Sequence, residues 1–176
     1  KYDPSAFPAS GKGWLEAVAF RVIADHIRAV AFTIADGQLP ANTGAGYVIR
    51  RILRRGVRYY YSYLDYKHPL LHQLVRVLAK QFEHVFPELE KQAEFIAKVI
   101  KEEEDAFLRT VDKGLFMLNE ISHDITGEEA FKLYDTYGFP LDLTKLIATE
   151  KNLDIDEAGF EKEMQKQKDR SRAATV

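Results

Sequence analysis

The 176-residue sequence carries 25 Lys and Arg against 27 Asp and Glu, and this formal net charge of -2 excludes a uniformly basic nucleic-acid binder. Hydrophobic residues make up 46% of the chain, enough for a sizeable core, and the absence of cysteine excludes disulfides, thiolate metal sites and a thiol nucleophile. No run approaches the ~20 apolar residues of a membrane span, and no signal-peptide pattern opens the chain. We therefore expect a cytoplasmic protein without a membrane partner, and the start at Lys1 indicates a piece of a longer protein.

Apolar periodicity predicts three helices in the first half of the chain. Residues 1–12 contain prolines and serines without a period, which is typical of a linker or loose arm. Helical spacing runs over residues 14–34, and Gly37 supplies the stop. A loop then leads to a second helix over about residues 47–65, and a third follows over about residues 70–82.

The longest helix is predicted in the second half. Pro87 suits a first turn, and the apolar stripe behind it continues for about 30 residues, with Gly114 as a weak point. A polar break at residues 122–127 precedes three shorter helices, the last of them strongly charged. They cover about residues 128–134, 143–150 and 157–170.

We therefore expect an all-α fold, an irregular helical bundle with one long helix of about 30 residues and a charged C-terminal helix. Residues 1–12 form the arm, and residues 13–121 a helical body that contains an arginine-rich helix. Residues 122–176 form a C-terminal part whose tail is a candidate for disorder.

Five arginines lie within nine residues of the second helix. At roughly 100° per residue they span an arc of about 140°, and guanidinium groups suit phosphate because they are planar, forked donors. Carboxylates of a neighbouring helix are the alternative partners, and the acidic run at residues 102–105, otherwise typical of a solvated helix face, offers them. RNA backbone contact and internal ion pairing both remain open for this arginine stripe, Arg50, Arg51, Arg54, Arg55 and Arg58.

Two polar residues stand in glycine-containing turns. Asn42 precedes the arginine-rich helix, where free backbone amides favour phosphate, although an N-cap or turn role is the simpler explanation for an asparagine taken alone. Asp135 lies among aromatic residues before a Gly-Phe-Pro turn. It is either a hydrogen-bonding residue at a helix end or an acceptor for a ligand, for example an exocyclic amine.

The sequence contains no complete active site. His68 and His72 have the spacing of a metal pair, but Pro69 lies between them and no suitably spaced carboxylate accompanies them. Nucleophile elbows, Walker loops and dinucleotide fingerprints are absent. We expect neither catalytic residues nor a metal site in this chain.

Several blocks of sequence together resemble the alanyl-tRNA synthetase family, in the right order and at a similar separation. They are Arg21-Val-Ile-Ala-Asp-His26-Ile-Arg28, Ala35-Asp-Gly37, Asn42-Thr-Gly-Ala-Gly-Tyr47, Arg50-Arg51-Ile-Leu-Arg54-Arg55 and Phe131-Lys-Leu-Tyr-Asp135-Thr-Tyr-Gly-Phe-Pro140-Leu-Asp-Leu-Thr144. The resemblance covers residues 21–174 and implies the helical tRNA-recognition domain between the class II catalytic core and the editing domain. Residues 1–20 match poorly.

The resemblance implies an activity that belongs to a larger enzyme. The parent would attach alanine to tRNA(Ala) with ATP and magnesium and would edit mischarged tRNA at a zinc site. This chain lacks the motifs for those steps, so we expect it to be inactive alone and without a cofactor. Its implied partners are the tRNA(Ala) acceptor stem and the catalytic core.

The resemblance also implies roles for individual residues. Asn42 and Asp135 would read the G·U wobble pair of the acceptor stem from its shallow minor groove, which requires the chain to bring two loops beside one groove. The five arginines would contact the RNA backbone and set the register. Supporting residues in the two turns would be Tyr47, Tyr137, Gly44, Gly46 and Gly138. The alternatives are a stand-alone RNA-binding module and an interaction scaffold without an RNA role.

Overall fold

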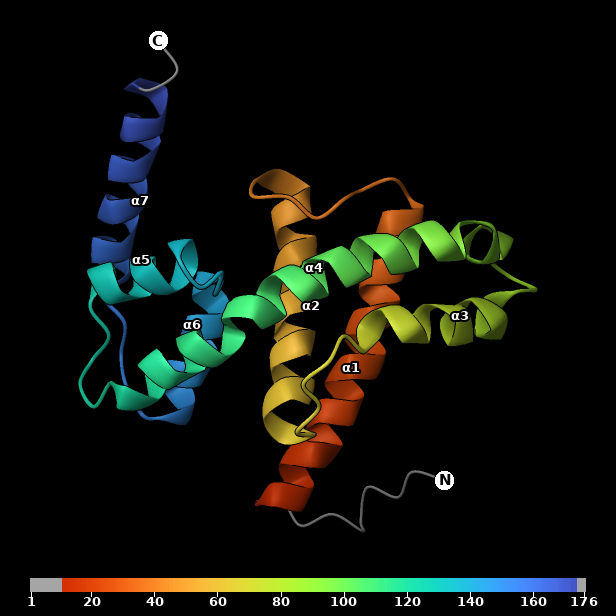
Figure 1. Cartoon of the computed structure of the whole chain (residues 1–176), viewed down its shortest axis with the longest axis horizontal. Helices are drawn as coiled ribbons and strands as arrows, with labels where there is room; N and C mark the ends of the chain where they lie inside the picture. Colours follow the sequence, from red (N-terminus) through yellow and green to blue (C-terminus); the bar gives the residue numbers. More distant parts are fainter. Residues whose placement is uncertain (1–10, 174–176) are drawn as a thin grey trace. The chain divides into compact units, whose positions relative to one another are not determined.

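The structure, a computed structural model, describes residues 11–173 with the exception of the Lys12 side chain, and that part of the chain contains seven α-helices and no strand (Figure 1). The expected all-α fold is confirmed, including the long helix. The helices are α1 (Lys12–Ala35), α2 (Gly44–Tyr63), α3 (Leu71–Phe82), α4 (Pro87–Glu120), α5 (Gly127–Asp135), α6 (Leu141–Glu150) and α7 (Glu157–Ala173).

The helix ends follow local chemistry. After α1, Gly37 has φ 88, a left-handed conformation that glycine adopts without a steric penalty. Pro87 is the first residue of α4, as its fixed φ and missing N–H favour. A capping box opens α5: Thr126 accepts from the backbone N–H of Glu129, whose side chain accepts from the backbone N–H of Thr126.

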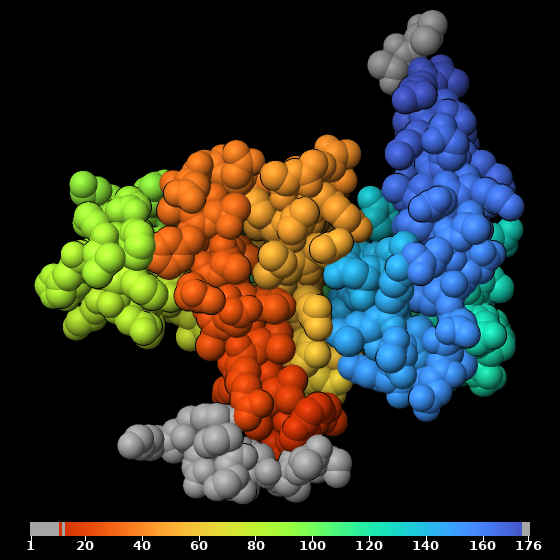
Figure 2. Space-filling model, turned by 180° about the vertical axis from the view of Figure 1, so that it is seen from behind, coloured from red at the N-terminus to blue at the C-terminus, as the bar shows by residue number. Residues whose placement is uncertain are grey.

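Two compact units make up the chain, residues 1–108 and 109–176, and the division falls inside α4. The boundary that the sequence predicts, at 121/122, stays a prediction and lies just beyond the end of that helix at Glu120. In the N-terminal unit, α1 and α2 lie side by side and α3 packs beside α1 (Figures 1 and 2). Apolar faces of these helices form its core, with fully buried residues such as Ile34, Leu53 and Tyr60.

A buried carboxylate joins three helices of the N-terminal unit. Glu104 of α4 is 0% exposed and accepts hydrogen bonds from the backbone N–H groups of Leu70, Leu71 and His72 at 2.8, 2.7 and 3.0 Å. It also accepts from the Tyr60 hydroxyl of α2 at 2.9 Å. Because α3 has no N-terminal side-chain cap of its own, Glu104 satisfies its first amides from a distance. The expectation of a solvated acidic face is therefore wrong for this residue.

The Tyr60 hydroxyl is fixed as the donor in this cluster. Burial, reinforced by the adjacent carboxylate of Glu104, raises the pKa of Tyr60 well above its usual range. The proton therefore stays on the phenol at any physiological pH, and α2 remains hydrogen-bonded to α4 through it.

The C-terminal unit is held by a parallel backbone bridge and by aromatic packing. The backbone N–H of Ile125 donates to Asp154 at 2.8 Å, and that of Asp156 donates to Ile125 at 2.9 Å. Phe160 of α7 packs against two rings of α5, Phe131 and Tyr134, with centroid distances of 6.4 and 5.7 Å. These contacts attach the first turns of α7 to α5.

Gly114 is a packing site and not a weak point of α4. The helix runs through it without interruption. A Cβ atom at this position would lie 2.3 Å from Cε2 of Phe139, which is fully buried. Glycine is therefore required because the ring of Phe139 lies directly on the helix backbone.

Helix α7 continues through Ala173, so this stretch of the tail is helical. The expected loose arm at residues 1–10 and the final residues 174–176 lie outside the described residues. Between them, no helix is both long enough and apolar enough to cross a membrane.

Candidate nucleic-acid interface

The loop that carries Asn42 is held close to the first turn of α2 by its glycines. A Cβ atom on Gly46 would lie 2.4 Å from the carbonyl oxygen of Leu39 and 2.6 Å from Cβ of Ala41. Gly44 has φ 61, in the left-handed region. These two of the three glycines in the predicted supporting set are thus structurally required for the loop path.

Asn42 is exposed and is not the N-cap of α2. That position belongs to Thr43, which has an extended backbone and makes no side-chain capping bond. Instead, Oδ1 of Asn42 accepts a hydrogen bond from Nη1 of Arg50, two turns further along α2. The capping explanation for Asn42 is therefore wrong, and a side-chain contact fixes its amide.

Arg50 is itself held by a carboxylate of α4. Its Nε donates to both oxygens of Glu103, at 3.2 and 3.1 Å, and its Nη2 donates to Oε1 at 2.6 Å. Arg54 adds a contact of 3.5 Å to the other oxygen. The side chains of Arg50 and Glu103 are only 18% and 14% exposed, so this ion pair is largely shielded from water.

The other arginines of the stripe also contact aromatic rings or are partly buried. Arg54 lies 5.3 Å from the ring centroid of Phe107. Arg58 is 4% exposed and stacks over Tyr63 at 4.6 Å. Arg51 and Arg55 are half-buried. Internal ion pairing, the alternative that the sequence left open, is confirmed for Arg50 and Arg54, and RNA backbone contact by the stripe stays a prediction.

Asp135 is the last residue of α5 and is exposed. Its Oδ1 accepts a hydrogen bond of 2.5 Å from Nε2 of Gln167 on α7. The helix then ends in a tight turn, in which Gly138 has φ 73 and its N–H donates to the carbonyl of Tyr134 at 3.2 Å. Asp135 thus hydrogen-bonds at a helix end while its carboxylate stays accessible to solvent.

The turn after Asp135 is anchored on both sides. The hydroxyl of Thr110 donates to the carbonyl of Tyr137 at 2.7 Å. The next aromatic residue, Phe139, is buried on Gly114, and its N–H donates to the carbonyl of Leu133 at 2.9 Å. A turn with this many fixed points holds the end of α5 in one position.

Sequence reasoning missed two residues of this site, Glu104 and Gln167. Glu104 stands on the same helical stripe as Ile100, Phe107 and Val111, and an acidic residue on an apolar stripe is the signal that could have revealed its burial. Gln167 had no such signal, because it lies in a strongly polar stretch. Glu103, in contrast, lies in the acidic run that the sequence offered as partners of the arginines.

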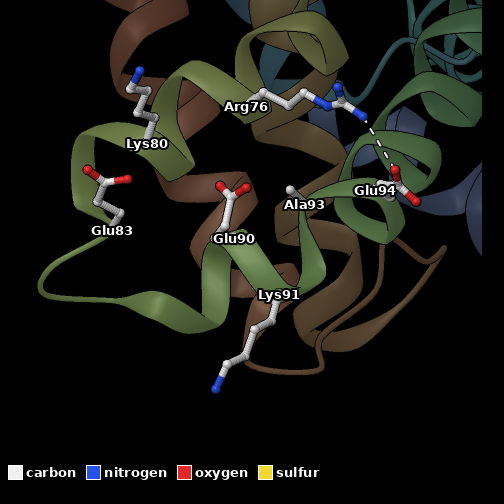
Figure 3. Close-up of a pocket in the computed structure, with 7 residues that line it drawn as sticks. All are labelled: Arg76, Lys80, Glu83, Glu90, Lys91, Ala93 and Glu94. Atoms are coloured by element: carbon white, nitrogen blue, oxygen red, sulfur yellow. Dashed lines mark hydrogen bonds and ion pairs between the residues drawn. The ribbon is translucent and has the colours of Figure 1, made fainter.

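A groove of about 620 Å³ between α3 and α4 offers a second surface (Figure 3). Arg76 and Glu94 approach to 3.3 Å across it, but their side chains are 77% and 89% exposed. Lys80 and Lys91 point away from it in the close-up. Exposed, mixed charges of this kind bind weakly, so we do not treat this groove as the functional site. No group of three or more potential metal ligands occurs among residues 11–173.

Comparison with known proteins identifies the class first. The family model described as tRNA synthetases class II (A) matches residues 9–176, so the chain belongs to this family. The resemblance to alanyl-tRNA synthetase is confirmed by curated relatives. The alanine–tRNA ligase of Christiangramia forsetii is 57% identical over 171 residues, 94% of this chain and 20% of the relative.

Two further relatives agree. The alanine–tRNA ligase of Cytophaga hutchinsonii is 59% identical over 165 residues, 89% of this chain and 19% of the relative. That of Staphylococcus saprophyticus is 52% identical over 176 residues, 94% of this chain and 20% of the relative. The chain therefore spans about a fifth of the length of the curated relatives that it matches.

Proposed function

We propose that this chain is the part of an alanine–tRNA ligase that binds the acceptor stem of tRNA(Ala) and reads its G·U wobble pair. The supporting observation is that Asn42 and Asp135 are both exposed, while each is held by one hydrogen bond to a neighbouring helix. An exposed polar side chain with a fixed direction is what recognition of a base edge requires.

The chemistry of the two side chains suits a minor groove. Guanine presents its N2 amine there as the distinctive donor, and pyrimidine O2 and purine N3 are acceptors. The carboxylate of Asp135 accepts from the amine, and the amide of Asn42 contacts an acceptor.

The proposal extends to the wider activity of the complete ligase. The complete ligase attaches alanine to tRNA with ATP and magnesium and carries a zinc ion in its editing domain. Residues 1–176 alone are inactive and need no cofactor, because the catalytic and editing residues lie elsewhere in the ligase. The complete ligase is located in the cytoplasm, where translation takes place.

The arginine stripe contributes positive charge beside the stem, and Arg51 and Arg55 contact the RNA backbone. Arg55 is the member that tests this most directly, because it is partly exposed to solvent and makes no ion pair with Glu103. Replacing Arg55 with Gln should weaken binding of this chain to G·U and G·C minihelices alike. It should also reduce the slope of log K against log salt by roughly 0.7–0.9 for each phosphate that is no longer neutralised. An unchanged slope would assign Arg55 to the protein interior.

Base reading is tested in the complete ligase that carries this segment. Asn42→Ala and Asp135→Ala should each lower the ratio of kcat/KM for G·U over G·C stems by about 5- to 150-fold, which is the discrimination that one good base contact supplies. Exposed residues of the same types, Asn119 and Asp169, provide the matched alanine controls. Equal discrimination by the Asn42 and Asp135 variants and by the wild type would refute the proposal.

A further inference from the structure

We infer that Glu103, Arg50 and Asn42 form a positioning relay, in which Glu103 fixes the guanidinium of Arg50 and Arg50 fixes the orientation of the Asn42 amide. The inference rests on the proposed reading of the wobble pair by Asn42 and adds how that reading is directed. It also gives Arg50 a role other than phosphate contact.

The first link is the ion pair between α4 and α2. Glu103 engages both Nε and Nη2 of Arg50, which is the forked arrangement that a guanidinium makes with a carboxylate. Both side chains are at least four-fifths buried, and the second contact from Arg54 keeps Glu103 in place. The fork therefore determines where the remaining nitrogen, Nη1, points.

The second link sets which end of the amide faces outward. Arginine has only donors, so the atom of Asn42 that meets Nη1 must be its oxygen. The Nδ2 group of Asn42 has no hydrogen-bond partner within the part of the chain that the structure describes. With the oxygen occupied and the side chain exposed, Asn42 presents two N–H donors to a ligand.

The consequence is a division of labour between the two reading residues. Asn42 becomes a donor for a minor-groove acceptor, either uracil O2 or guanine N3, while Asp135 is an acceptor for the guanine amine. A freely rotating amide would accept and donate equally well, and it would tolerate more base pairs. The relay removes that tolerance.

Asn42→Asp tests the donor assignment in the complete ligase. This change keeps an oxygen for Arg50 but replaces both outward donors with an acceptor. Discrimination between G·U and G·C stems should fall as far as in Asn42→Ala. If Asn42→Asp discriminates as well as the wild type while Asn42→Ala does not, Asn42 reads the pair as an acceptor and the inference fails, although the proposed function survives.

Arg50→Lys and Glu103→Gln test the relay itself. Lysine keeps the charge but cannot bond Glu103 and Asn42 together in one plane. Each change should lower G·U discrimination about tenfold without altering the salt slope of binding. In an Asn42→Ala background, neither change should lower the discrimination any further. Glu102→Gln, at an exposed neighbouring position, is the matched control and should leave discrimination unchanged.

The opposite pattern would overturn the relay. If Arg50 contacts phosphate, Arg50→Lys should retain discrimination, whereas Arg50→Gln should weaken both stems equally and reduce the salt slope. Circular dichroism of each variant separates loss of folding from loss of discrimination. If Glu103→Gln does not fold, Arg50→Lys alone tests the relay. Failure of Asn42→Ala to alter discrimination would instead refute the proposed function.

Discussion

Two helix ends, one in each unit of the molecule, are capped by a charged residue that is distant in sequence. In the N-terminal unit, the carboxylate of Glu104 accepts from three amides at the start of α3. In the C-terminal unit, the ammonium group of Lys151 donates to the carbonyls of Leu118, Asn119 and Ile121 at the end of α4, at 2.5, 3.0 and 2.6 Å. Each charge has the sign that the helix dipole favours.

The two solutions differ in their exposure to water. Glu104 is completely buried, whereas Lys151 is half-buried and one of its carbonyl partners, Asn119, is an exposed residue. A buried charge depends on every one of its partners, because no water replaces a missing one. A partly solvated charge tolerates the loss of a partner better, because water can replace that partner. Similar capping geometry should therefore contribute very different stabilising free energies in the two units.

Removal of Glu104 should have the largest effect. Glu104→Ala leaves three amides and the Tyr60 hydroxyl without an acceptor, so the free energy of unfolding of the N-terminal unit should fall by about 3–5 kcal/mol. Hydrogen exchange at the amides of Leu71 and His72, together with denaturant unfolding, measures the loss. Glu102→Ala on the exposed side of the same helix is the control. A loss below that of the control would show that water replaces the carboxylate.

Gly114→Ala sharpens the comparison, because it disturbs the C-terminal unit through packing instead of charge. The added methyl group meets the ring of Phe139 at 2.3 Å, and overpacking of this kind costs about 1–3 kcal/mol. The displaced ring belongs to the turn that follows Asp135, so we expect reduced G·U discrimination as well as lower stability. Thermal unfolding and aminoacylation measure both effects. Gly37→Ala lacks a steric neighbour and strains only its own φ, so it should leave discrimination unchanged.

Lys151→Met should have a smaller effect than either change. It removes the ammonium group but keeps the apolar stem, and we expect a loss of about 1–2 kcal/mol from the C-terminal unit. The loss should shrink in 1 M salt, since partly exposed charges are screened, whereas that of Glu104→Ala should not. The exposed Lys168→Met is the control. Equal salt dependence of the two losses would contradict the difference in burial on which the comparison rests.

Sequence patterns predicted the helices better than the contacts between them. Apolar stripes and punctuation by Gly37 and Pro87 determine where α1 and α4 end and begin, because these signals act within a few residues. The partners of Asn42 and Asp135 depend on which helix faces packed together. Arg50 was visible only as one arginine among five, and Gln167 as one polar residue in a charged helix. Tertiary packing, which local spacing does not encode, selected them.

A change at His26 should have the smallest effect and tests whether the N-terminal unit is the pH-sensitive one. Burial lowers the pKa of His26, the positive charge of Arg55 acts in the same direction, and Asp25 at 3.4 Å opposes both. Because the unfolded chain binds the proton more readily, the contribution of His26 to stability is complete above the unfolded pKa of about 6.5. It is lost as the pH falls below that value toward the lowered folded pKa. In denaturant unfolding between pH 7.5 and 5, His26→Gln should therefore flatten the decline in stability. His84→Gln, at a side chain that is 91% exposed, should not. If the stability of both variants declines as steeply as that of the wild type, protonation of His26 does not limit the stability of this unit in acid.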